Sequence, residues 1–200
     1  MQIDTRTMTS GSGMPVTLYY PEGTTRALPS VVLMHERYGL VQHTGDLARR
    51  LADEGYCVAT PDLFYYMENQ DAIHSGAAKA APSDPFILER LDEVVSVLSG
   101  EPVADSSKLG MIGVCQTGRY SMIYGAKRPL DACIVLYGGV SDWDQSERRP
   151  EHLRYQKELC KMIESLQFRG TAVLVTGAAA GIGFSCPHIQ LLLDLQRSAS

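Results

Sequence analysis

The segment 109–127 constrains the fold of this chain more than any other. Residues 109–114 form an apolar run with the composition of a buried strand, and the residues after Gly118 have helical composition. The run GVCQTG joins the two parts and places Cys115 between Gly113 and Gly118. Small flanking residues permit a sharp strand-to-helix turn whose apical side chain stands above the sheet. The segment therefore predicts a strand, a tight turn and a helix, with a thiol at the turn.

Cys115 is a candidate nucleophile because of its place at this turn. The unpaired N–H groups and the dipole at a helix N-terminus favour the thiolate, which is the form that attacks a carbonyl carbon. The alternative is a structural cysteine at the end of a core strand, since free cysteines are often buried. The choice between the two depends on residues elsewhere in the chain.

Strand and helix patterns alternate along the rest of the chain, and a loop rich in Ala, Gly and polar residues is predicted over 64–83. Strands are predicted at 16–20, 31–34, 57–60, 132–137 and 172–176, and helices at 47–54, 84–98, 153–166 and 187–196. Such alternation predicts an α/β fold, a mostly parallel sheet with helices on both faces in a three-layer sandwich. A chain of 200 residues, 44% of them hydrophobic, fits one domain over 1–200.

Composition excludes several classes of partner. The net charge of −5 provides no basic surface for nucleic acid. No apolar stretch reaches the length of a membrane span, and the N-terminus lacks the order of a signal peptide, so a cytoplasmic protein without a membrane partner is expected. The five cysteines contain no CxxC pair, which argues against a disulfide framework or a zinc site. No cofactor or metal is expected, and the protein is expected to be a monomer or a homodimer.

Polar residues follow the predicted strand at 31–34, where His35, Glu36 and Arg37 come in succession. Sites in open parallel sheets lie beyond the carboxyl ends of the strands, so Glu36 is a candidate partner of Cys115. Strand alternation sends the side chains of His35 and Glu36 to opposite sides. His35 is therefore predicted to be a packed or hydrogen-bonded structural histidine.

The runs MHERYGL, LARRLADEGYCVATPDLFY, GMIGVCQTG and VLYGG resemble the dienelactone hydrolase family of α/β hydrolases over about residues 10–155, with a divergent tail at 156–200. The resemblance implies a hydrolase that cleaves small ester or lactone bonds through an acyl-enzyme on Cys115. It also implies that Glu36 controls the protonation of the thiol and that the backbone N–H groups of Arg37 and Gln116 form the oxyanion hole.

Three positions depart from the family pattern. Ala180 stands where the family has the aspartate of its triad, and the one histidine beyond it, His188, is predicted to begin a helix rather than to follow a strand. His188 stays a third catalytic candidate, and Asp142 and Asp144 are candidate substitutes for the acid. Thr117 stands where glycine is common, and a β-branched residue is expected to crowd the turn. A catalytically impaired hydrolase fold that acts as a binding protein is therefore the alternative function.

A second motif follows the predicted strand at 172–176. The run TGAAAGIG, which contains Gly177–Gly183, resembles the dinucleotide-binding loop of short-chain dehydrogenases. Only seventeen residues follow Gly183, fewer than the supporting sheet and the acidic ribose ligand require. A dinucleotide-binding protein is therefore the least favoured hypothesis.

Overall fold

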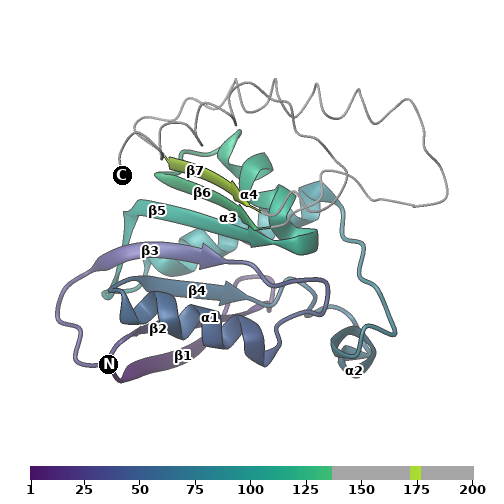
Figure 1. The fold of residues 1–200 in the computed structure, drawn as a ribbon, viewed down its shortest axis with the longest axis horizontal. Helices are drawn as coiled ribbons and strands as arrows, with labels where there is room; N and C mark the ends of the chain where they lie inside the picture. The colour runs from purple at the N-terminus through teal and green to yellow at the C-terminus, as the bar shows by residue number, and fades with distance from the viewer. Residues whose placement is uncertain (137–171, 177–200) are drawn as a thin grey trace.

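A sheet of seven strands in the order β1-β2-β4-β3-β5-β6-β7 forms the centre of the molecule (Figure 1). The computed structural model describes residues 1–136 and 172–176. β1 pairs with β2, and β2 with β4, in antiparallel fashion, and the pairs from β4 to β7 are parallel. The strands are β1 Ile3–Thr9, β2 Pro15–Pro21, β3 Leu28–Leu33, β4 Cys57–Pro61, β5 Ala104–Val114, β6 Ala132–Leu136 and β7 Ala172–Thr176.

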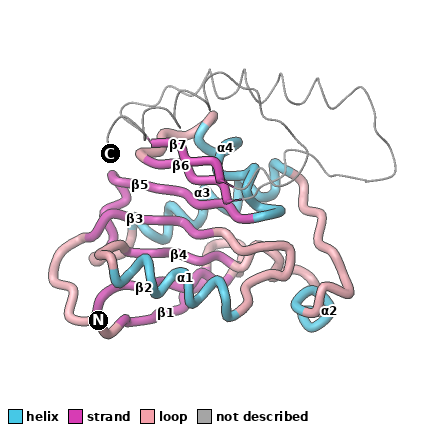
Figure 2. Tube along the Cα trace, in the orientation of Figure 1, coloured by secondary structure: helices cyan, strands magenta, loops and turns pink. Residues whose placement is uncertain are grey.

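Helices cover both faces of this sheet, which confirms the predicted α/β architecture (Figures 1 and 2). α1 (Gln42–Asp53) lies in front of the sheet in Figure 1, whereas α3 (Asp84–Ser99) lies behind it with α4 (Gly118–Gly125) packed against it. α2 (Gln70–His74) stands apart from the sheet, and the one-turn helix η1 (Cys115–Thr117) links β5 to α4.

Strand alternation divides the core into two parts. Val32 on β3 and Met34, just after it, face the cluster that includes the α3 and α4 side chains, whereas Val31 and Leu33 face the cluster under α1. Both faces of the central strands are therefore apolar, which is why these strands appear in the sequence as continuous hydrophobic runs.

The structure departs from the predicted elements in three places. β1 was not predicted, because all seven of its residues are partly or fully exposed and its sequence is polar. The predicted loop at 64–83 contains α2, whose N-cap Asn69 accepts a hydrogen bond from Ala72 N–H at 2.9 Å. β5 begins at Ala104 rather than at 109, since its polar first half pairs with the start of β3. The helices predicted at 153–166 and 187–196, and Tyr137, lie outside the described residues.

The other strands and helices predicted among the described residues are present, with their ends shifted by a few residues. α1 ends before Gly55, whose φ of 91° is the left-handed conformation that stops a helix. α3 opens at Asp84 and Pro85, with Ser83 as its N-cap. β7 occupies the strand predicted at 172–176. In the part of the chain that the structure describes, no helix combines the length and apolar character needed to cross a bilayer.

Candidate active site at the carboxyl ends of β3 and β5

Cys115 lies at the apex of a sharp turn between β5 and the helix that follows it. Its φ of 53° makes it the one non-glycine residue with a left-handed backbone among those described. Gly113 provides the room for this turn, because a Cβ there would lie 2.7 Å from both Gly118 Cα and the Thr117 carbonyl oxygen. The Cys115 side chain is partly exposed. The strand, turn and helix predicted from GVCQTG are therefore present, with the thiol at the apex.

The register of the sheet brings the turn after β3 to the same edge as the turn after β5. Leu33 pairs with Ile112 in the last step of the parallel ladder between these strands. Glu36 and Cys115 each follow that pair by three positions. The two predicted site residues therefore leave neighbouring strands at the carboxyl edge of the sheet, where sites in parallel sheets lie.

Thr117 joins the two turns through its side chain. The residue is fully buried, and its Oγ1 accepts a hydrogen bond from Val114 N–H at 3.1 Å. The hydroxyl lies 2.8 Å from the carbonyl oxygen of His35 and 3.0 Å from that of Val114, so its single proton has a carbonyl acceptor on each side. The sequence suggested only crowding at Thr117, whereas the structure shows hydrogen bonds that a glycine could not make.

His35 is buried and hydrogen-bonded, as predicted from strand alternation. Its Nε2 accepts from Leu63 N–H at 3.1 Å, so Nδ1 carries the proton and donates to the Glu36 carbonyl at 2.7 Å. The ring also meets Phe64 edge-on, with 4.6 Å between the ring centroids. Burial lowers the pKa of His35 despite the bond to Glu36 and the charge of Asp62, so this imidazole is neutral.

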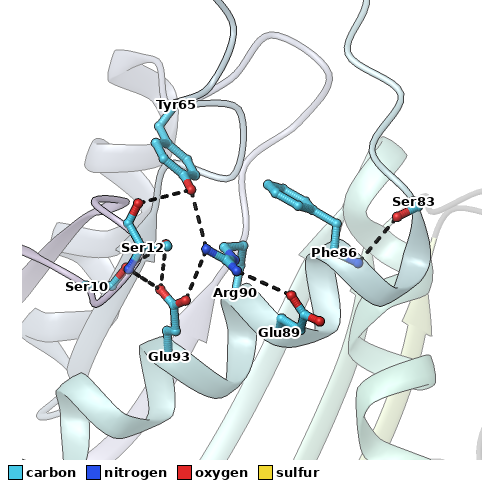
Figure 3. Close-up of polar contacts among 8 residues, drawn as sticks. All are labelled: Ser10, Ser12, Tyr65, Ser83, Phe86, Glu89, Arg90 and Glu93. Atoms are coloured by element: carbon cyan, nitrogen blue, oxygen red, sulfur yellow. Dashed lines mark hydrogen bonds and ion pairs between the residues drawn. The ribbon is translucent and has the colours of Figure 1, made fainter.

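His35 holds the segment after β4 at Leu63, and a polar cluster that includes Arg90 and Glu93 of α3 holds the same segment at Tyr65 (Figure 3). Tyr65 Oη donates to the Ser12 carbonyl at 3.4 Å and accepts from Arg90 at 3.5 Å, while Arg90 pairs with Glu93 at 3.1 Å. Burial would raise the pKa of Glu93, but hydrogen bonds from Ser10 and Ser12 and the charge of Arg90 lower it. This cluster ties the turn between β1 and β2, the segment after β4 and α3 together.

The side chains of the two predicted oxyanion-hole residues reach one loop segment, 76–80. Gln116 Nε2 donates to the Ala80 carbonyl at 2.7 Å, and the Arg37 guanidinium donates to the Gly76 carbonyl at 3.4 Å. Arg37 also lies 4.8 Å from the centroid of the Tyr38 ring. Segment 76–80, which belongs to the long loop predicted over 64–83, is thus a neighbour of the site. Its particular contacts could not be predicted, because they are made through backbone carbonyls.

The family comparison agrees with this geometry. The model of the dienelactone hydrolase family matches residues 14–163, which include both turns. The chain belongs to the dienelactone hydrolase family. A Salmonella typhi relative named "Putative carboxymethylenebutenolidase" is 32% identical over 149 residues, which are 71% of this chain and 54% of the relative. An Escherichia coli K12 protein of the same name is 31% identical over 148 residues, 70% of this chain and 54% of that protein.

Solved structures show the α/β-hydrolase fold of this family. A "Putative Dienelactone Hydrolase" from Klebsiella pneumoniae superposes with a TM-score of 0.66 at 20% identity, covering 99% of this chain and 98% of the other. A dienelactone hydrolase-like promiscuous phosphotriesterase from metagenomic libraries gives a TM-score of 0.65 at 17% identity, covering 100% and 99%. The chain spans about half the length of the two enteric relatives that it matches.

The other positions that the sequence singled out lie outside the described residues: His188, Ala180, Asp142, Asp144 and the glycine-rich run Gly177–Gly183. The strand before the glycine-rich run is β7, which lies at the edge of the described sheet, whereas a dinucleotide loop follows a strand at the topological switch point. Within residues 1–136 and 172–176, no three His, Cys, Asp or Glu side chains gather as metal ligands would.

Proposed function

We propose that this member of the dienelactone hydrolase family cleaves small esters or lactones through an acyl-enzyme on Cys115. The observation that carries the proposal is the left-handed backbone of Cys115 at the turn after β5, next to the turn after β3 that carries Glu36. Strained backbone at a strand-to-helix turn is typical of an exposed nucleophile. The names of the relatives agree with this reaction class.

The proposed reaction has two steps. In the first, the Cys115 sulfur forms a bond to the carbonyl carbon and the bond from that carbon to the leaving oxygen breaks, which gives a thioester and an alcohol. For a lactone, the same step opens the ring. In the second, water attacks the thioester, releases the carboxylic acid and returns the thiol. The backbone N–H groups of Arg37 and Gln116 are the proposed donors to the oxyanion in both steps.

Glu36 is the proposed acceptor of the thiol proton. A carboxylate beside the thiol can take this proton when the substrate arrives, and the nucleophile is then the thiolate. The fold supports this role because the turns that carry Glu36 and Cys115 leave adjacent strands in register. Glu36 is partly buried at this edge of the sheet.

A binding protein without turnover is the second candidate. The observation that favours it is Ala180, at the position where the family pattern has a triad aspartate. Without a triad, the acylation step depends on Glu36, whereas deacylation lacks an imidazole to activate water. This candidate predicts a stable acyl-enzyme, or binding alone.

The test is hydrolysis of p-nitrophenyl acetate and of a dienelactone by the wild type and by Cys115→Ala, with mass spectrometry of the Cys115 peptide. Acylated Cys115 with turnover that is lost in Cys115→Ala supports the hydrolase. A stoichiometric burst without turnover supports the second candidate. Turnover that survives in Cys115→Ala contradicts the proposed nucleophile. Cys133→Ala is the control, because it removes a thiol that is buried in the core.

A further inference from the structure

The relative position of the two turns is not set by strand pairing alone. The ladder between β3 and β5 ends at Leu33 and Ile112, and one more backbone bond joins Met34 N–H to the Ile112 carbonyl at 2.9 Å. Glu36 and Cys115 lie beyond these bonds. Catalysis by an oriented pair of groups is sensitive to misplacement of about 1 Å, so what holds the turns together matters for the reaction.

Thr117 provides a bond between the two turns past the end of the ladder. Its hydroxyl reaches the His35 carbonyl, one residue before Glu36, from a position two residues after Cys115. The same oxygen accepts from Val114 N–H, one residue before Cys115. The Thr117 hydroxyl oxygen is therefore hydrogen-bonded to the backbone of the residue just before each predicted site residue, Val114 before Cys115 and His35 before Glu36.

His35 extends this connection to the end of β4. The His35 carbonyl accepts a hydrogen bond from the Thr117 hydroxyl. The His35 ring donates to the Glu36 carbonyl and accepts from Leu63 N–H. The backbone at residues 35 and 36 is thus held from the β5 side and from the β4 side, through groups that are buried. Buried hydrogen bonds are costly to leave unmade, so this arrangement resists displacement.

We propose that the Thr117 hydroxyl is a positioning group that fixes the turn carrying Cys115 relative to the turn carrying Glu36. The inference rests on the proposed function and adds to it the device that aligns its two groups. Glycine, which is common at this position in the family pattern, has no hydroxyl.

Three variants separate positioning from general stability. Thr117→Val keeps the shape and removes the hydroxyl, and Thr117→Ser keeps the hydroxyl and removes the methyl group. Ser121→Ala is the matched control, because Ser121 Oγ is buried in α4 and donates to the Gly118 carbonyl at 2.8 Å, away from residues 35 and 36. Each variant is compared with the wild type in thermal unfolding and in kcat and KM for p-nitrophenyl acetate.

We expect Thr117→Val to lower kcat by about tenfold or more with KM changed by less than about threefold, because alignment is lost and binding is not. Thr117→Ser should restore kcat to within about threefold of the wild type. Ser121→Ala should lower the unfolding temperature and leave kcat unchanged. Equal values of kcat in Thr117→Val and Ser121→Ala overturn the proposal.

A second measurement does not require turnover. The rate at which iodoacetamide alkylates Cys115 is measured near neutral pH, by mass spectrometry of its peptide, for Glu36→Gln in the wild-type and in the Thr117→Val backgrounds. The effect of Glu36→Gln should be at least about threefold smaller in the Thr117→Val background. Equal effects in the two backgrounds overturn the positioning role, and no effect in either background overturns the role of Glu36 on which it rests. Absence of an acyl-enzyme in the wild type overturns the proposed function instead.

Should Thr117→Val not fold, Thr117→Ala replaces it in both measurements. This variant removes the same hydroxyl without placing a methyl group against the His35 carbonyl. The expected losses and the outcomes that contradict them stay the same.

Discussion

Gly113 allows β5 and the first turn of α4 to come as close as they do. A side chain there meets backbone atoms of Thr117 and Gly118 rather than the movable end of another side chain. Gly113→Ala should therefore lower the free energy of unfolding by about 1–3 kcal/mol, as overpacking of a rigid core does. Urea titration of the two proteins measures this difference.

The control for this prediction is Gly11→Ala. No atom lies within 4 Å of a Cβ added at Gly11. Its free energy of unfolding should stay within about 0.5 kcal/mol of the wild type. A similar loss in both variants would show that the effect comes from removing a glycine and not from the close approach at the turn between β5 and α4.

The candidate site could be predicted from sequence only where it depends on local pattern. Cys115 and Glu36 each follow an apolar run that ends in small or polar residues, and the sheet then brings them to one edge. The hydrogen bond from Thr117 to the His35 carbonyl could not be predicted, since a carbonyl acceptor leaves no trace in the sequence. The contacts of segment 76–80 were missed for the same reason.

His35 predicts how stability responds to acid. Because burial holds its pKa below the ordinary value, the unfolded chain takes up a proton at this residue before the folded protein does. Stability should therefore be unaffected by His35 above the ordinary histidine pKa and should fall as the pH drops below it. One such group changes the free energy of unfolding by at most about 1.4 kcal/mol per pH unit.

His35→Gln tests this dependence, since an amide can donate and accept in place of the imidazole but does not titrate. We expect urea titrations across the mildly acidic range to show a shallower loss of stability in His35→Gln. The exposed His43 of α1 is the matched position, and His43→Gln should keep the slope of the wild type. An unchanged slope in His35→Gln would contradict the role assigned to its burial.

At the scale of elements, β1 shows why part of the fold escaped prediction. Its sequence lacks a continuous apolar face, because the strand lies at the edge of the sheet and pairs with β2 alone. The central strands were predictable because both of their faces are buried. α2 has only five residues, too few for a helical period to show in the sequence.

β1 is also held by an ion pair with the segment before β5. Arg6 pairs with Glu101, whose side chain is only 8% exposed. Arg6→Met leaves this carboxylate without its partner and should lower the free energy of unfolding by about 1–3 kcal/mol, measured by urea titration. Arg128→Met, which breaks a more exposed pair between Arg128 and Asp92, should cost clearly less. Equal costs would show that burial of Glu101 does not matter.

At the scale of the whole molecule, the three described thiols differ in how deeply they are buried. Cys57 and Cys133 belong to the core on the α3 and α4 side, and burial raises the pKa of each to about 11, with the charge of Glu101 adding to the effect at Cys57. Cys115 is partly exposed. Timed alkylation of the native protein should therefore modify Cys115 long before Cys57 or Cys133.

Mass spectrometry of the separate peptides measures these rates, and the same reaction in denaturant is the control. Once the chain is unfolded, the three thiols should react at similar rates. Early alkylation of Cys133 in the native protein would contradict the packing of β6 against α4.

The pairing of β3 with β5 also has a consequence for how the protein is made. All of α1, β4, α2 and α3 lies between Leu33 and Ile112 in the chain, so the two halves of the site meet only after a large loop has closed. Contacts between such distant segments form late and slow folding. A nascent chain on the ribosome cannot bring the Glu36 turn and the Cys115 turn together until the segment that carries Cys115 has emerged, so the candidate nucleophile meets its partner only after α1, β4, α2 and α3 have been made.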